Sequence, residues 1–281
     1  MEWLNNLNEA IKYIEKNLTE EISYEKAAMI AGCSTSYFQR LFTYISGISL
    51  SEYIRRRRMT QAAFDLQTGQ MKVIDVALKY GYDSPSAFNR AFKSVHGITP
   101  VASRENNTKL SSFLPIMLSV NVSGGKNMPY QIEEKDKIRA IGYRIPLTVN
   151  IEENQKEIPK FWKETICSGK IEELLSMKDE KVEGVLGVTD FMDTQEIFYY
   201  IAVTSDKQPT DGMYEIEIPA HKWAVFNSDG PYKENIQNIY KRFFTEWLPF
   251  SGHKYAEVAD VEVYKDREIS GYSELWLGIS D

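Results

Sequence analysis

Amide, hydroxyl and guanidinium side chains recur at a spacing of 50 residues in the first third of the sequence. The stretch GCSTSYFQRLFTYISGIS at 32–49 is followed by a similar stretch, GYDSPSAFNRAFKSVHGIT, at 81–99. Arg binds guanine, and Gln and Asn bind adenine, through paired hydrogen bonds that discriminate bases by about 1–3 kcal/mol. These side chains therefore indicate that the chain reads double-stranded DNA. The residues expected to face outward are Ser36, Gln39 and Arg40 in the first stretch, and Pro85, Ser86, Asn89 and Arg90 in the second, with the Gln, Asn and Arg side chains as candidate base readers.

Apolar residues between these polar ones predict the helices that present them. Phe38 and Phe42 correspond to Phe88 and Phe92 in the second stretch. A spacing of four puts each pair on one buried helix face, which leaves the polar residues outside. A short helical pattern and a glycine precede each stretch, an arrangement typical of a helix-turn-helix. The helices predicted for this all-α domain are 3–17, 24–31, 35–45, 50–67, 72–80 and 84–95.

Arginines also allow a less specific interpretation. Because Arg40 and Arg90 occupy the same place in both stretches, each could instead form an intramolecular salt bridge or contact only phosphates. The run at 55–58 is four consecutive arginines, which point in nearly all directions on a helix. At most two of them can contact one DNA backbone, and the others are expected to extend along the surface or pair with acids.

Charge is divided unevenly along the 281 residues. Residues 1–105 carry 13 Lys and Arg against 11 Asp and Glu, a net charge of +2, which leaves −9 for the remainder of a chain whose total is −7. This division confines DNA binding to the first part. No apolar run is long enough to span a bilayer and the first residues do not resemble a signal sequence, so a cytoplasmic location is predicted. His96, His221 and His253 share no metal-ligand spacing, and neither a metal nor a cofactor is expected.

The second part of the sequence has the pattern of an α+β domain. Residues 107–128 are predicted to be a linker, and residues 129–281 alternate short strands with two helices, 151–166 and 231–247. The order strand–strand–helix–strand–strand occurs twice, which predicts two pseudo-repeated halves. The predicted strands are 130–134, 138–145, 184–190, 196–203, 213–218, 221–227, 260–265 and 273–279.

Residues 5–105 resemble the DNA-binding domain of AraC-family regulators, closest to the MarA/SoxS/Rob branch. The motifs that carry the resemblance are Ser34-x-x-x-Phe38-Gln39-Arg40-x-Phe42 and Ser84-x-x-x-Phe88-x-Arg90-x-Phe92. The resemblance implies a domain, residues 1–106, whose two helix-turn-helix units are joined by a long helix and occupy successive major-groove segments. It places the seven outward-facing residues at base-contacting positions. Ser36 stands where close relatives carry Trp, and Pro85 where they carry Gln, so a different operator is expected.

Residues 129–281 are similar to GyrI-like effector-binding domains. The similarity rests on Pro219-Ala-x-x-Trp223-Ala-Val-Phe, on Gly230-Pro-Tyr232 and on the tail Tyr272-Ser-Glu274-Leu-Trp276. It implies an aromatic-lined pocket with a glutamate near its base in members that bind cationic drugs, and Glu274 matches that glutamate. A solvent-facing or backbone-bonded Glu274 with Trp276 in the core is the alternative. The residues expected to bind ligand are Glu274, Trp276, Trp162, Tyr199, Trp223 and Tyr232.

Together these observations predict a DNA-binding transcription regulator, an activator, that senses a small lipophilic ligand, with cations among the expected ligands. Its expected partners are promoter DNA, RNA polymerase and the effector, and no membrane. Two alternatives remain for the second domain, a module that binds a protein partner and a hydrolase. Neither Gly-x-Ser-x-Gly nor His-Glu-x-x-His occurs in the sequence, and no enzymatic activity is expected.

Overall fold

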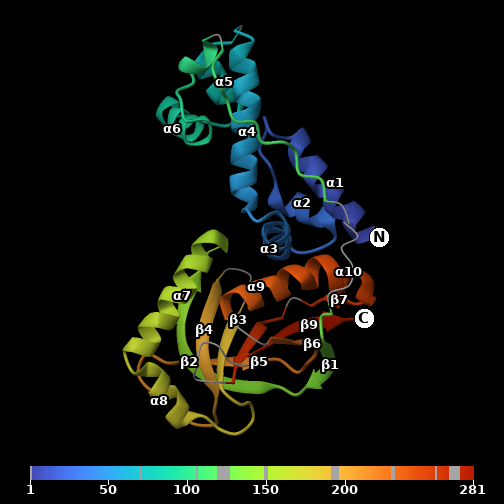
Figure 1. Cartoon of the computed structure of the whole chain (residues 1–281), viewed down its shortest axis with the longest axis vertical. Coiled ribbons are helices and arrows are strands. Elements are labelled where there is room, and N and C mark those ends of the chain that lie inside the picture. Colours follow the sequence, from blue (N-terminus) through green and yellow to red (C-terminus); the bar gives the residue numbers. More distant parts are fainter. Residues whose placement is uncertain are drawn as a thin grey trace. The chain divides into compact units, whose positions relative to one another are not determined.

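The chain folds into two compact units, Met1–Val120 and Asn121–Asp281 (Figure 1). The structure is a computed structural model that describes residues 2–69, 71–105, 107–118, 127–148, 151–190, 196–228, 232–256, 258–265 and 273–281. Within these residues, no helix has the length and apolar character needed to cross a membrane. Both the all-α and the α+β predictions are confirmed.

Short helices form the first unit, and serines and glycines define their ends. The side chain of Ser34 accepts a hydrogen bond from the backbone at the start of α3, and Ser84 does the same for α6. Gly47 and Gly97 end these helices with φ of 76° and 78°, a conformation that glycine adopts without strain. The helices are α1 (Glu2–Lys16), α2 (Tyr24–Ala31), α3 (Thr35–Ser46), α4 (Leu50–Gln67), α5 (Val73–Lys79), α6 (Pro85–His96) and the 3-10 turn Ala102–Arg104.

Helix α4 joins the two helix-turn-helix units, α2–α3 and α5–α6. Phe42 of α3 contacts the ring of Tyr53 in the first half of α4 with centroids 5.2 Å apart, and Phe88 and Phe92 of α6 pack with Met59 of its second half. In Figure 1, α3 and α6 lie near opposite ends of α4 and are both seen nearly end-on, so their axes run in similar directions. With 18 residues, α4 is about 27 Å long, which is comparable to the ~34 Å of one DNA turn.

The four arginines of α4 bind other parts of the first unit. Arg57 is buried and makes a two-point contact with Glu15 of α1, with Nε–Oε1 and Nη2–Oε2 distances of 2.9 Å and 2.7 Å. Arg55 pairs with Glu52 and donates to Ser94 of α6 at 2.5 Å. The two others are also engaged, Arg56 with Glu52 and Arg58 with the backbone carbonyls of residues 18 and 20. The run thus fixes α4 to α1, to the segment that follows α1, and to α6.

Part of the predicted linker belongs to the first unit. Residues 110–118 lie along α1 and α4, where the amide of Asn8 exchanges two hydrogen bonds of 2.9 Å with the backbone of Leu118. The hydroxyl of Tyr53 accepts from the Ile116 N–H at 3.1 Å and donates to Glu15 at 2.7 Å. The structure thus differs from the predicted boundary at 106, because the polar groups of this segment find partners on helices that precede it by 50 residues or more.

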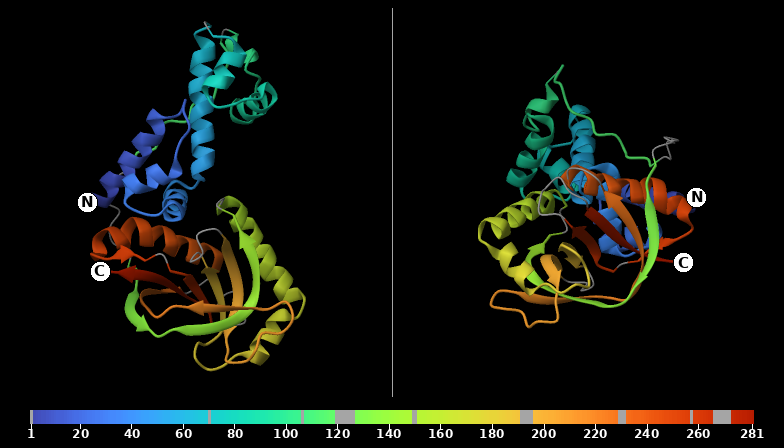
Figure 2. Two further views of the ribbon diagram at one scale, coloured as in Figure 1. Left: turned by 180° about the vertical axis from the view of Figure 1, so that it is seen from behind. Right: turned by 60° about the horizontal axis from the view of Figure 1, so that its bottom comes forward.

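The second unit is a strongly twisted antiparallel sheet with helices on one face (Figures 1 and 2). The predicted strands are confirmed, whereas α8 and the short β7 were not predicted. The strands are β1 (Tyr130–Lys135), β2 (Ile138–Leu147), β3 (Val185–Asp190), β4 (Ile197–Thr204), β5 (Tyr214–Ile218), β6 (His221–Ser228), β7 (Lys254–Tyr255), β8 (Asp260–Tyr264) and β9 (Ser273–Ser280). The helices are α7 (Ile151–Cys167), α8 (Lys170–Met177), α9 (Tyr232–Arg242), the π-helical turn Phe243–Trp247 and α10 (Leu248–Ser251).

The strand order shows the predicted internal repeat. The order is β1-β6-β9-β8-β3-β4-β2-β5, with β7 paired to β9. Each strand of the first half has a counterpart in the second: β1 corresponds to β5, β2 to β6, β3 to β8 and β4 to β9. If each strand is replaced by its counterpart, the same order results, read in reverse. The two halves therefore meet where β3 pairs with β8, and Gly187 lies opposite Glu262 at the centre of that pairing. We call this pairing the seam.

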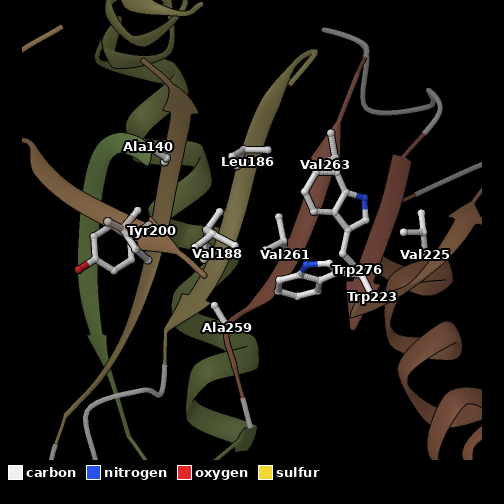
Figure 3. Close-up of a cluster of buried hydrophobic side chains, with 13 residues drawn as sticks. Ala140, Leu186, Val188, Tyr200, Trp223, Val225, Ala259, Val261, Val263 and Trp276 are labelled. Carbon is white, nitrogen blue, oxygen red and sulfur yellow. The ribbon is translucent and has the colours of Figure 1, made fainter. Parts of the chain in front are cut away.

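The helices of both halves cover the same face of the sheet, which we call the helical face. Phe161 of α7 packs with Tyr199 and Ile201 of β4, and Phe243 contacts the ring of Phe226 on β6 at 5.7 Å. Ile201, Phe226 and the seam residues are connected through the strand register and so point to the same side. Side chains on the opposite face form a separate core that includes Trp223, Val261 and Trp276 (Figure 3).

The contact between Arg57 and Glu15 predicts a large effect on stability. Arg57→Met should lower the free energy of unfolding of the first unit by about 3 kcal/mol, because it leaves the Glu15 carboxylate without its cation. Lys12→Met, which removes an exposed pair with Glu9, should leave this free energy nearly unchanged. Urea denaturation followed by circular dichroism measures both. Equal stabilities for the two variants would contradict the structural role of Arg57.

Candidate DNA interface and effector site

The residues predicted to read bases in the second helix-turn-helix lie on its open side. Pro85, Ser86, Asn89 and Arg90 are all exposed in the first two turns of α6, whereas Phe88 is fully buried. Within the described part of the chain, Arg90 has no ion pair, so its guanidinium is available to a base or a phosphate. The alternative of an intramolecular salt bridge therefore has no support at this position.

The corresponding residues of the first helix-turn-helix are half-buried. Ser36, Gln39 and Arg40 lie on the side of α3 away from the buried Phe38 and Phe42. The hydroxyl of Ser36 lies 3.1 Å from the hydroxyl of Ser34, the residue that caps the helix. Neither Gln39 nor its counterpart Asn89 points into the core. The structure thus supports the predicted outward orientation at both ends of α4, and base contacts remain a prediction.

The residues predicted to bind ligand are divided between the two faces of the sheet. Trp162 and Tyr199 lie on the helical face, where the indole Nε1 donates to the tyrosine hydroxyl at 2.9 Å. Trp223 and Trp276 lie on the opposite face, with ring centroids 6.4 Å apart in the core drawn in Figure 3. The structure therefore does not bring these aromatic residues together. The side chain of Tyr232 lies outside the described residues.

Glu274 shares the face of Trp276, as strand alternation predicts, and it already has partners. One carboxylate oxygen lies 2.5 Å from Nζ of Lys265, and the other accepts from Nε1 of Trp276 at 2.9 Å. The lysine neutralises the negative charge that a cationic ligand would require. Trp276 lies in the core, as the alternative interpretation expected, whereas Glu274 is bonded to the side chains of Lys265 and Trp276 rather than to solvent or to the backbone.

A different carboxylate, Glu262, lies on the helical face at the seam. Its Oε2 accepts hydrogen bonds from the hydroxyls of Tyr199 at 2.8 Å and Tyr264 at 2.7 Å. The rings of Trp162 and Tyr264 meet edge to face at 5.0 Å. Protein atoms surround the carboxylate, yet Glu262, Tyr264 and Trp162 each keep a partial exposure to solvent. We call Glu262, Tyr199, Tyr264 and Trp162 the carboxylate cluster.

Burial raises the pKa of Glu262 above its ordinary value. The Tyr264 and Tyr199 hydroxyls act in the opposite direction by donating to the carboxylate, and the nearby charge of Asp260 acts with burial. Asp260 itself accepts hydrogen bonds from Tyr255 at 2.6 Å and Tyr240 at 3.2 Å. Because the folded-state pKa of Glu262 is raised, its contribution to stability is lost as the pH rises through that pKa. A bound cation would offset this cost.

Gly187 makes room for the carboxylate cluster. A Cβ atom at this position would lie 2.3 Å from the Tyr199 hydroxyl and 2.7 Å from Oε2 of Glu262. By the symmetry of the strand order, Gly187 and Glu262 occupy equivalent positions in the two halves. One half thus supplies the carboxylate and the other supplies the space into which it extends.

The sequence pattern around Glu262 could have identified it as a candidate site residue. The resemblance of the C-terminal tail to effector-binding domains directed the prediction to Glu274 instead. Asp260 and Glu262 alternate with Val261 and Val263 in a strand whose neighbours are apolar. Two acids on one side of such a strand indicate a polar site within a covered face. Among the described residues, no group of three or more His, Cys, Asp and Glu side chains could hold a metal ion.

Comparison with known proteins identifies both units. A family model described as an integron-associated effector binding protein matches residues 131–279. The chain belongs to that family. A helix-turn-helix domain model matches residues 27–106, and the resemblance to AraC-type regulators is confirmed.

Two known proteins and one solved structure are similar to parts of the chain. The transcriptional activator AarP of Providencia stuartii is 42% identical over 108 residues, which are 38% of this chain and 80% of AarP. The probable transcription factor PqrA of Proteus vulgaris is 39% identical over 106 residues, 37% of this chain and 87% of PqrA. A putative transcription regulation protein from Staphylococcus aureus MU50 has a solved structure that covers 55% of this chain and all of its own, with 19% identity and a TM-score of 0.48.

The chain is therefore a DNA-binding transcription regulator with an effector-binding domain. The helix-turn-helix match lies in the first unit. The relatives of that unit are transcription regulators, and no family of enzymes is indicated.

The exposure of α6 predicts that Arg90 contributes to sequence recognition. Arg90→Ala should weaken binding to a duplex that the wild-type chain selects from a random pool by about tenfold or more, and weaken binding to a scrambled duplex less. Lys93→Ala, an exposed change one turn further along α6, is the matched control. Fluorescence anisotropy at fixed salt measures both. Equal losses on both duplexes for Arg90→Ala would assign Arg90 to phosphate contact alone.

Proposed function

We propose that the chain is a transcription activator that senses a lipophilic organic cation at Glu262. Binding at the carboxylate cluster would alter how the chain acts with RNA polymerase at a promoter in the cytoplasm. Ser36, Gln39 and Arg40 in α3, together with Pro85, Ser86, Asn89 and Arg90 in α6, would contact the promoter. The observation that carries the effector proposal is a surrounded carboxylate without a cationic partner among the described residues, bordered by aromatic rings.

Electrostatics favours a cation over other ligands at this place. A carboxylate in surroundings of low polarity attracts positive charge more strongly than one in water. The faces of Tyr and Trp rings attract cations as well, by about 0.5–2 kcal/mol each. An anion would meet Glu262 and the neighbouring Asp260, which disfavours it. A large apolar cation also gives up little hydration on entering, because its charge is spread over many atoms.

The two glutamates provide a matched comparison. Glu262→Gln should lower affinity for tetraphenylphosphonium by roughly tenfold to a hundredfold, since the charge of the site is lost. Glu274→Gln should change this affinity little, because Glu274 is paired with Lys265 on the opposite face. Isothermal titration calorimetry measures both, and thermal melting checks that each variant folds. Unchanged binding by Glu262→Gln would sink the proposed cation site.

The raised pKa of Glu262 makes binding dependent on pH. The cation requires the carboxylate, whereas burial favours the protonated acid in the free protein. Affinity should therefore rise with pH through the free-protein pKa, approaching tenfold per pH unit below it. Titrations from pH 4.5 to pH 8 test this, with the Glu262→Gln variant expected to show no such dependence. A wild-type affinity that falls as the pH rises would contradict the proposal.

A further inference from the structure

Among the described residues of the second unit, two buried hydroxyl groups lack hydrogen-bond partners. The Oγ atoms of Ser228 and Ser273 have none, although these residues are only 4% and 0% exposed. Burying a hydroxyl without a partner costs about 1–3 kcal/mol, so such groups are uncommon in folded proteins. Their presence as a pair on neighbouring strands points to a role beyond stability.

The strand register places both hydroxyls on the helical face beside the carboxylate cluster. Tyr264 on β8 lies opposite Ser273 on β9, and Ser273 lies opposite Ser228 on β6. Tyr264, Ser273 and Ser228 thus form a row across three neighbouring strands. Glu262 belongs to the adjacent parallel row, because it lies two residues before Tyr264 on β8. Two other buried atoms without partners, Nε2 of His221 and Nε1 of Trp223, belong to residues on the opposite face of β6.

The serines also lie on the side of the site away from Trp162. The hydroxyls that donate to Glu262 belong to Tyr199 on β4 and Tyr264 on β8, and Trp162 of α7 donates in turn to the Tyr199 hydroxyl. The second half supplies Ser273 and Ser228 on strands β9 and β6. The serines thus extend a polar row from the seam into the half that holds α9.

We infer that Ser228 and Ser273 bind a hydrogen-bond acceptor carried by the effector, such as a carbonyl or hydroxyl oxygen. This inference rests on the proposed cation site at Glu262 and specifies its ligand further. Each serine has an O–H that no protein acceptor uses, and two adjacent donors suit a single oxygen with two lone pairs. The effector class is then an organic cation that carries a neutral oxygen on a side arm, rather than a hydrocarbon cation.

The sheet geometry sets the length of that arm. Diagonal neighbours on adjacent antiparallel strands are about 7–8 Å apart, which applies to Glu262 and Ser273. Ser228 lies one strand further, which adds about 4.8 Å. A cation bound at the carboxylate would reach the serines with an arm of about four or five bonds.

Two ligands that differ only at the end of the arm test the inference. One is a triphenylphosphonium cation with a four-carbon arm that ends in a carboxamide. The other has the same arm ending in an isopropyl group, which matches the shape of the carboxamide without its acceptor. Calorimetric titration of the full chain gives the affinity of each cation, and melting temperatures give the stability of each variant without ligand.

The variants are Ser228→Ala, Ser273→Ala and the double change. Each single change should weaken the carboxamide cation by roughly threefold to tenfold and leave the isopropyl cation unchanged. Each should also keep or raise the melting temperature, because it removes a hydroxyl that has no partner. Ser205→Ala is the control: its buried hydroxyl donates to the Met177 carbonyl at 2.7 Å, so its loss should lower stability and affect both cations equally.

The inference would be overturned if the wild-type chain bound the two cations with equal affinity, or if the serine variants lost affinity for both cations equally. Neither result would contradict the cation site at Glu262. Lower melting temperatures in both serine variants with unchanged carboxamide binding would show that the hydroxyls serve the fold alone. Failure of both cations to bind the wild-type chain would overturn the cation site at Glu262 and this inference with it.

Discussion

The effector-binding unit depends on placing a carboxylate where protein atoms surround it and still allowing it to ionise. Burial of Glu262 raises the free energy of its charged form, and the hydroxyls of Tyr199 and Tyr264 recover part of that cost. The balance leaves a group whose ionised form a nearby positive charge would favour. In this account, recognition is therefore electrostatic first, and the aromatic rings select cations that are apolar enough to enter.

In both units an internal repeat differs between its copies at candidate functional positions. In the first unit the capping serines and terminal glycines recur, while Gln39 in α3 is replaced by Asn89 in α6. In the second unit the strand order repeats, while Gly187 in one half corresponds to Glu262 in the other. Repetition gives each unit a scaffold, and the differences between the copies lie at the side chains proposed to bind DNA or the effector. A Cβ at Gly187 would collide with the cluster, so the difference is required at that place.

Periodicity and end signals were sufficient to predict most of the fold. The serine and glycine pairs locate α3 and α6, and apolar alternation locates the strands. The short helix α8 follows α7 after only Ser168 and Gly169, so sequence periodicity alone did not separate it. The effector residues were harder to predict, because a strand pattern shows which residues share a face but not which face the helices cover. Glu274 and Trp276 were correctly placed together, yet on the side opposite to α7 and α9. Contacts such as Tyr53 with residue 116 depend on tertiary packing that no local pattern contains.

The titration of the Glu262 carboxyl group tests this account most directly. Carbon-13 NMR of the chain labelled at glutamate carboxyl carbons, with Glu262→Gln to assign the signal, follows its protonation with and without tetraphenylphosphonium. The account predicts a midpoint above the ordinary 4.5 in the free protein and a lower midpoint when the cation is bound. A midpoint at or below 4.5 in the free protein, or one that the cation does not move, would contradict it.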